Sequence, residues 1–277
     1  MPELPEVETV CRGLNQLLSP PVEIEAVQLR RKSLRTPIPG EIKTTLRGQQ
    51  ILRVRRRAKY LLWETSGELN ILSHLGMTGS WRMVASPAER GTRLHDHVEI
   101  WFRDGRRLIY NDPRRFGFID LYSKGQEAAN SWLKHLGPEP LDRLEFHGDY
   151  LWQASRGRRA KIKALLMDQR VVVGVGNIYA SEALYRAGVR PGRAAGRISL
   201  KEADRIVLAV REVLQEAIQT GGSSIRDFKS ALQESGGFQD RLFVYGRAGE
   251  PCRLCAQTIA QKVIAGRSSY WCPKCQV

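Results

Sequence analysis

Residues 252–275, CRLCAQTIAQKVIAGRSSYWCPKC, place four cysteines in the pattern C-x2-C-x16-C-x2-C. Each C-x2-C pair can present two thiolates from one tight turn, and two such pairs complete a tetrahedral zinc site. Because all four ligand positions are then filled by protein, we expect one structural Zn²⁺, held by Cys252, Cys255, Cys272 and Cys275. The fifth cysteine, Cys11, is predicted to be a small buried residue of the first helix.

The charge of the chain points to a polyanionic partner. Its 277 residues include 44 Lys and Arg against 29 Asp and Glu, which gives a formal net charge of +15. Such an excess is typical of proteins that bind nucleic acid or an anionic membrane surface. The membrane alternative is weak, because the longest apolar run, VVVGVGNIYA (171–180), is too short for a bilayer and is interrupted by glycine. With no signal-peptide pattern at the start, we expect a cytoplasmic protein.

The first half of the chain predicts an antiparallel β-sandwich preceded by a helix. Apolar residues recur at helical spacing over 5–18. Alternating or β-branched segments then predict strands, and Asp104-Gly105 is typical of a hairpin turn. The predicted strands are residues 22–29, 50–57, 69–75 and 97–102.

A boundary follows at HLGPEPL (135–141), after which the pattern becomes helical. Helices are predicted within 159–169 and 177–188. Ser199 and Glu202 form the sequence pattern of a capping box, which predicts a long helix running to about residue 219. The glycine-rich segment TGGSS (220–224) ends that helix.

Three basic clusters, RVRRRAK (53–59), NDPRRFG (111–117) and SRGRRAKIK (155–163), favour a track for phosphates. In the first cluster strand alternation would place four cations on one face, Arg53, Arg55, Arg57 and Lys59. The alternative is a solvated edge strand, whose charges prevent aggregation.

The segment NDPRRFG allows two interpretations. An exposed pair of Arg114 and Phe116 on a stiff turn would suit insertion into a base stack. The local sequence taken alone favours a simple turn with Phe116 packed in the core. Farther along the chain, glycines before Asn177, a predicted helix N-cap, could let a phosphate approach free backbone amides.

The first residues, MPELPEVETV, combine an ordinary helix start with possible chemistry. Glu3 and Glu6 lie where the helix dipole favours negative charge, and Pro5 suits the first helical position. If Met1 is removed, Pro2 carries a secondary amine. Attack of that amine on a sugar carbon would give an iminium ion, an electron sink. Glu3 could then shuttle protons, and Glu6 could orient the amine or remain a helix cap.

Together these segments resemble the bacterial formamidopyrimidine-DNA glycosylase family over nearly the whole chain. The motifs occur in family order: PELPEVETV, RRRAKYLL, HLGMTGS, HDHVEI, NDPRRFG, HLGPEPL, IKALLMDQRVVVGVGNIYASEAL, VYGRAGEPC and GRSSYWCPKCQ. The resemblance implies an α+β multidomain fold, with an N-terminal antiparallel β-sandwich flanked by helices, a helix–two-turn–helix domain and a four-cysteine zinc finger. We expect the sandwich over 1–137, a linker over 138–150, the helical domain over 151–240 and the finger over 241–277.

The resemblance also implies an activity and a set of residues. The activity is removal of oxidised purines from damaged duplex DNA, with lyase cleavage by β,δ-elimination, by a monomer associated with the nucleoid. Pro2 corresponds to the nucleophile, Glu3 to the general acid, Lys59 to the proton donor for β-elimination and Arg267 to the residue linked to δ-elimination. Met77, Arg114 and Phe116 match the inserted triad. The implied DNA contacts are His74, His95, Arg158, Lys163 and Asn177, and the implied lesion loop is Thr220, Gly221, Gly222, Ser223 and Ser224.

Two other functions remain as alternatives. The endonuclease VIII family, which acts on oxidised pyrimidines, shares the Pro2-Glu3 start and the zinc finger, but its start resembles P-E-G-P-E, whereas this chain has Leu4. A zinc-ribbon DNA-binding protein without catalysis would explain the charge and the cysteines. It would not require the combination of Pro2, Glu3, Lys59 and Arg267.

Overall fold

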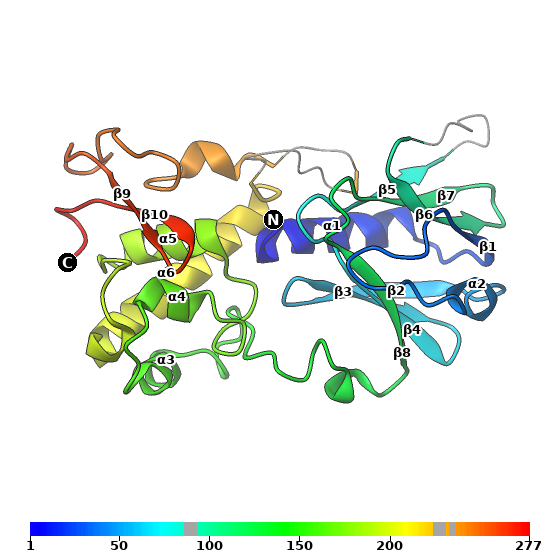
Figure 1. Cartoon of the computed structure of the whole chain (residues 1–277), viewed down its shortest axis with the longest axis horizontal. Coiled ribbons are helices and arrows are strands. Elements are labelled where there is room, and N and C mark those ends of the chain that lie inside the picture. Colours follow the sequence, from blue (N-terminus) through cyan, green and yellow to red (C-terminus); the bar gives the residue numbers. More distant parts are fainter. Residues whose placement is uncertain (86–92, 224–230, 233–235) are drawn as a thin grey trace. The chain divides into compact units, whose positions relative to one another are not determined.

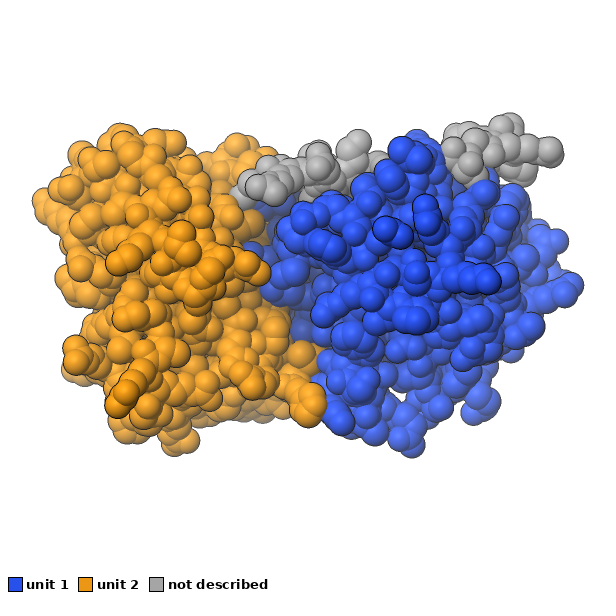
Figure 2. Space-filling view, viewed as in Figure 1, with its two compact units in different colours: residues 1–134, 220–237 blue, residues 135–219, 238–277 orange. Residues whose placement is uncertain are grey.

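The computed structural model describes residues 1–85, 93–223, 231–232 and 236–277. The chain divides into two compact units, one of residues 1–134 and 220–237 and one of residues 135–219 and 238–277 (Figures 1 and 2). Among the described residues, no helix has both the length and the apolar character needed to cross a membrane.

The first unit is built around strands. It contains α1 (Leu4–Leu17), β1 (Ile24–Leu29), α2 (Ile42–Thr45), β2 (Ile51–Arg57), β3 (Tyr60–Thr65), β4 (Leu69–His74), β5 (Ser80–Val84), β6 (Asp96–Phe102), β7 (Arg107–Asn111), β8 (Phe118–Ser123) and the 3₁₀ turn η1 (Glu127–Ala129).

These strands form two four-stranded antiparallel sheets, ordered β1-β6-β7-β5 and β2-β3-β4-β8. Apolar side chains of both sheets and of α1 share one buried core. Within it Trp63 of β3 meets Trp81 of β5 edge to face, with ring centroids 4.8 Å apart. The predicted β-sandwich is therefore confirmed.

The predicted turn at Asp104-Gly105 joins β6 to β7, and in it the Gly105 amide donates a hydrogen bond to the Phe102 carbonyl.

Helix α1 has the buried stripe that its sequence predicts. Val7, Val10 and Leu14 are almost fully buried against the sandwich. Cys11 lies in the same stripe and donates to the Val54 carbonyl of β2, which confirms its structural role. The prediction that Pro5 begins the helix is wrong by one residue, because Leu4 is the first helical residue and Glu3 is the N-cap.

The pairing of the strands places four of the segments that connect them at one end of the sandwich. In one sheet Tyr60, His74 and Phe118 are paired neighbours at the ends of β3, β4 and β8. In the other sheet Ser80 and Asp96 both pair with Asn111 at the end of β7. The turns at 58–59, 75–79, 93–95 and 112–117 therefore emerge from the same end. Most of the predicted site residues of this unit lie on these turns.

The second unit is helical and ends in a β-hairpin. It contains α3 (Gly148–Ser155), α4 (Ile162–Leu166), α5 (Asn177–Arg186), α6 (Leu200–Gln219), the 3₁₀ turns η2 (Ala195–Arg197) and η3 (Phe238–Arg241), and strands β9 (Ala260–Ile264) and β10 (Arg267–Trp271).

The capping box before α6 is confirmed, since the Ser199 amide donates to Glu202 Oε2 and the Glu202 amide donates to Ser199 Oγ. The prediction that Asn177 is the N-cap of α5 is wrong. Asn177 is the first helical residue, and Gly176 occupies the cap position in extended conformation.

Candidate functional site

The start of α1 holds two buried carboxylates. Glu3 and Glu6 are each only 3% exposed, and they form a capping box in which the Glu3 amide donates to Glu6 Oε2 at 2.8 Å. Pro2 lies directly before this turn and is also buried, whereas Met1 is 56% exposed. The cap therefore fixes the backbone on which Pro2 and Glu3 lie.

Lys59 lies in the two-residue turn between β2 and β3. The turn is tight enough to place Ala58 at a φ of 55°, and it points Lys59 into the protein, where the side chain is buried. Burial lowers the pKa of Lys59 below its ordinary value of 10.5, although the negative charges of Glu3 and Glu6 oppose that shift. The charges of Glu3 and Glu6 at the start of α1 therefore act on Lys59, as expected for residues that share one catalytic site.

This position corrects the prediction of one basic face on β2. Lys59 is in the turn rather than on the strand, so it does not belong to the predicted face. Arg53, Arg55 and Arg57 keep the strand alternation, because the register shift between Ile51 and Arg53 precedes them. Arg55 forms ion pairs with Glu64 and with Glu127, the latter at 2.8 Å. Arg55 is therefore largely neutralised within the protein.

Glu6 also holds the base of a distant loop. Its Oε1 accepts a hydrogen bond from the Ser223 amide at 2.8 Å, and its side chain packs so closely on Gly222 that a Cβ there would lie 3.0 Å from Oε1. Ser223 pairs with Gly237, and the Gly237 amide donates to the Thr220 carbonyl. Gly222 and Ser223 of the predicted loop therefore lie against the helix start, Thr220 bonds to Gly237, and Ser224 lies outside the described residues.

His74 ends β4 and is held as a neutral imidazole. Its ring stacks on Phe118 with an interplanar angle of 9°, and its Nδ1 accepts a hydrogen bond from the Gly76 amide. Burial, together with the positive charges of Lys59 and Arg35, lowers the pKa of His74 to about 4. The ring proton must then lie on Nε2, which leaves a neutral donor available to a ligand.

The turn after β4 carries Met77, which is partly exposed. The neighbouring loop carries Arg114 and Phe116, and the Arg114 guanidinium lies over the Phe116 ring at 4.7 Å. Phe116 is 46% exposed, so the interpretation of it as a core residue is wrong. Its apolar ring is presented to solvent beside a cation, as the insertion interpretation requires.

His95 lies at the same end of the sandwich, in a left-handed conformation with φ of 72°. Its side chain is exposed. Asp96, the next residue, is buried and accepts hydrogen bonds from Arg82 and from the Arg93 amide. These bonds fix the backbone that presents His95.

In the second unit, two predicted contacts are held by protein partners. Lys163 is almost fully buried and donates to the Ser268 carbonyl and to Ser269 Oγ, at 3.0 and 2.7 Å. Arg158 is exposed and lies 3.9 Å from a carboxylate oxygen of Asp168. Lys163 thus ties α4 to β10, and its place among the DNA contacts stays a prediction.

Asn177 lies at the start of α5, where its side-chain amide reaches the Tyr245 hydroxyl at 3.5 Å. One turn further on, the buried carboxylate of Glu182 accepts three hydrogen bonds, from the amides of Phe243, Val244 and Tyr245. Burial raises the pKa of Glu182, while these donated bonds act against the rise. Sequence reasoning does not find Glu182 and Tyr245, because only the fold brings residue 245 to this helix.

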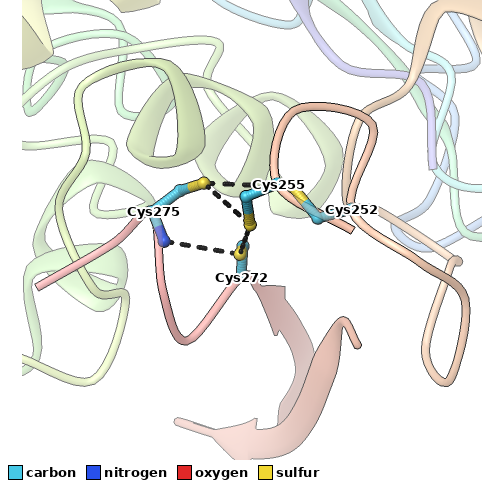
Figure 3. Close-up of side chains that lie close together, drawn as sticks. All are labelled: Cys252, Cys255, Cys272 and Cys275. Carbon is cyan, nitrogen blue, oxygen red and sulfur yellow. Dashed lines mark hydrogen bonds between the residues drawn. The ribbon is translucent and has the colours of Figure 1, made fainter. Parts of the chain in front are cut away.

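The four cysteines meet as predicted (Figure 3). All four sulfur atoms lie within 4.8 Å of one another, which is close enough for thiolates on one tetrahedral zinc ion. The Tyr185 hydroxyl contacts the Cys252 sulfur at 3.2 Å, so α5 supports the cluster from outside. These donors fit a structural zinc site with four thiolate ligands. Arg267 lies exposed at the start of β10, in the hairpin between the two cysteine pairs.

The fold and the sites together define a class: a zinc-finger protein with an N-terminal β-sandwich and a helical second unit. Three family models match the chain in order. The formamidopyrimidine-DNA glycosylase N-terminal domain matches residues 1–119, the formamidopyrimidine-DNA glycosylase H2TH domain residues 136–229, and the zinc finger found in FPG and IleRS residues 249–277.

Whole proteins agree with these matches. The chain is 50% identical over 277 residues to the formamidopyrimidine-DNA glycosylase of Bdellovibrio bacteriovorus, with all of both chains covered. It is similar to a crystal structure of a Lactococcus lactis FPG mutant bound to Fapy-dG-containing DNA, with a TM-score of 0.91, 36% identity and 99% of each chain covered. A MutM complex with carbocyclic 8-oxo-G-containing DNA gives a TM-score of 0.90 at 36% identity, again over 99% of each chain. The chain belongs to the formamidopyrimidine-DNA glycosylase family.

Proposed function

We propose that this protein removes oxidised purines, such as 8-oxoguanine and formamidopyrimidines, from duplex DNA and then cleaves the strand at the resulting abasic site. The observation that carries the proposal is the buried helix start, where the capping box of Glu3 and Glu6 directly follows Pro2 and both carboxylates act on the buried Lys59. The solved relatives bound to Fapy-dG and 8-oxo-G DNA support this substrate class.

The chemistry starts at the Pro2 nitrogen, which becomes an amine only when Met1 is removed. The amine attacks C1′ of an extruded nucleotide, the bond from C1′ to the base breaks, and the base leaves with a proton. Glu3 protonates the sugar ring oxygen as the ring opens, which gives an iminium ion at C1′. That ion makes the C2′ proton acidic, so its loss expels the 3′ phosphate and a second elimination expels the 5′ phosphate. We assign Lys59 to the first elimination and Arg267 to the second.

The remaining predicted residues would bind DNA. Flipping a nucleotide costs a few kcal/mol, which insertion of Met77, Arg114 and Phe116 would offset. A neutral His74 can donate from Nε2 to a phosphate oxygen without adding charge. With His95, Arg158, Lys163 and Asn177, these residues would bind the DNA backbone, and the loop at 220–224 would cover the flipped base.

The zinc site holds the hairpin that presents Arg267. We propose that the protein acts as a monomer, in the cytoplasm and on the nucleoid.

The test of this proposal is an excision assay with two duplexes, one carrying 8-oxoguanine opposite cytosine and one carrying an oxidised pyrimidine. We expect faster release of the purine, followed by strand cleavage that leaves phosphates at both ends of the gap. A preference for the pyrimidine would instead favour an endonuclease VIII-like activity. Binding without base release would favour the non-catalytic zinc-ribbon alternative.

The lowered pKa of Lys59 predicts an alkaline limb in the pH profile of strand cleavage, that is, a fall in the cleavage rate at high pH. A proton donor works while it is protonated, so the rate of strand cleavage at a preformed abasic site should fall as pH rises through the pKa of Lys59. Because burial lowers that pKa, the fall should be centred below 10.5, the ordinary value for lysine. We expect a Lys59→Gln variant to cleave more slowly and to lack this limb.

Lys32→Gln is the matched control, since Lys32 is exposed and should leave the profile unchanged. If Lys59→Gln kept the same alkaline limb, Lys59 would not be the proton donor.

A further inference from the structure

The three residues assigned to insertion lie on two separate connections. Met77 lies on the turn of residues 75–79, here called the Met77 turn, and Arg114 and Phe116 lie on residues 112–117, here called the Arg114 loop. These segments join different pairs of strands. Insertion requires the three side chains to enter the duplex together, so the two connections must keep a fixed mutual position.

A single hydroxyl joins the two connections. Thr78, the residue after Met77, donates from Oγ1 to Asp112 Oδ1 at 2.6 Å. The same oxygen accepts a hydrogen bond from the Arg114 amide at 3.2 Å. The first of these bonds is short because its acceptor is a carboxylate, and such bonds are stronger than bonds between neutral groups. The Thr78 side chain therefore fixes the backbone of Arg114 directly.

Asp112 continues this connection to the far end of the Arg114 loop. It is completely buried, and its Oδ2 accepts a hydrogen bond from the Gly117 amide at 2.8 Å. Its carbonyl accepts from His97 Nε2 at 2.9 Å and from the Arg115 amide. One carboxylate thus closes the loop on itself, while its backbone anchors the loop to β6.

Close backbone contact completes the connection. A Cβ on Gly76 would overlap the peptide between Phe116 and Gly117, so only glycine lets the Met77 turn approach the Arg114 loop this closely. Arg115 takes a left-handed φ of 53°, which reverses the loop and leaves Phe116 exposed. A strained backbone of this kind persists only where its surroundings hold it.

We propose that Thr78 and Asp112 are positioning residues that lock the Met77 turn to the Arg114 loop, and so set how well the protein reads the base opposite the lesion. This inference rests on the proposed function, in which Arg114 faces that base. Without the hydrogen bonds of Thr78 and Asp112, here called the lock, each insertion into DNA would have to order the Arg114 loop. The entropy cost of that ordering would reduce the difference in excision rate between the correct and the incorrect opposite base. The lock should therefore affect opposite-base preference more than chemistry at the sugar.

The test compares Thr78→Val with Thr78→Ser. Valine keeps the shape of threonine but removes the hydroxyl, whereas serine keeps the hydroxyl and serves as the rescue variant. Three substrates separate the roles: duplexes with 8-oxoguanine opposite cytosine or opposite adenine, and a single-stranded oligonucleotide with a preformed abasic site. The last substrate needs no opposite base, so its cleavage reports on Pro2 chemistry alone.

For Thr78→Val we expect excision opposite cytosine to be about 10-fold slower, since two hydrogen bonds are lost. The ratio of excision opposite cytosine to excision opposite adenine should move toward one, while cleavage of the single strand keeps its rate. Thr78→Ser should restore the ratio.

Unchanged excision and unchanged preference in Thr78→Val would overturn the inference. So would an equal loss on all three substrates, which would indicate a general folding defect, or a serine variant as impaired as the valine variant. Failure of the unsubstituted protein to excise from either duplex would instead overturn the proposed function, and this inference with it.

Discussion

A Pro2→Gly variant is expected to release 8-oxoguanine at least about 10³-fold more slowly than the unsubstituted protein, because the secondary amine that forms the iminium ion is gone. A glycine terminus is a more flexible primary amine, and its imine can lose the N–H proton and with it the fixed positive charge. Binding to a duplex with an uncleavable abasic analogue should be retained, since Pro2 contributes chemistry rather than charge. Single-turnover excision and equilibrium binding measure the two effects separately.

Pro5→Ala is the matched control for this experiment. Pro5 lies on the same first turn of α1 but carries no terminal amine, so the variant should keep its excision rate. Comparable excision by Pro2→Gly and the unsubstituted protein would exclude Pro2 as the nucleophile.

A Cys272→Ser variant is expected to lose its zinc and most of its affinity for damaged duplex. A structural zinc ion contributes about 10–16 kcal/mol to folding in zinc-finger peptides, so a site with three thiolates should not hold the hairpin in place. Cys272 is completely buried within the small cluster that also contains Tyr185 and Ile259, and loss of the metal would expose that cluster. Zinc content by mass spectrometry and titration with fluorescent duplex measure the two losses.

Cys11→Ser provides the control, since Cys11 lies on α1 and takes no part in the thiolate cluster. It should retain one zinc ion and full affinity. Full affinity in a zinc-free Cys272→Ser protein would show that the finger does not contribute to DNA binding.

Local patterns predict those parts of the fold whose physical cause is also local. The spacing of Val7, Val10 and Leu14 predicts α1, and the cysteine spacing predicts the zinc cluster. The hairpin at Asp104-Gly105 needs only the conformational freedom of Gly105, whose φ is 84°. In each case residues close in sequence determine the structure.

The predictions from local sequence are wrong where residues distant in the sequence determine the position of a side chain. The local sequence of Phe116 favours a place in the core, but the loop is bonded to the distant Thr78, reverses at Arg115 and leaves Phe116 exposed. Arg55 belongs to a cluster that predicts phosphate contacts, yet Glu127 from a remote segment pairs with it. The bond from Ser223 to Glu6 spans 217 positions of sequence, and no short motif could reveal it.

Borohydride trapping tests whether the chemistry takes place at the Pro2 nitrogen. The protein, shown by intact mass to lack Met1 and to carry zinc, is mixed with a duplex containing 8-oxoguanine opposite cytosine and reduced during turnover. We predict a covalent protein–DNA complex on a denaturing gel, with the cross-link mapped by peptide mass to Pro2. Excision without any trapped complex, or a cross-link mapped to another residue such as Lys59, would show that Pro2 is not the nucleophile.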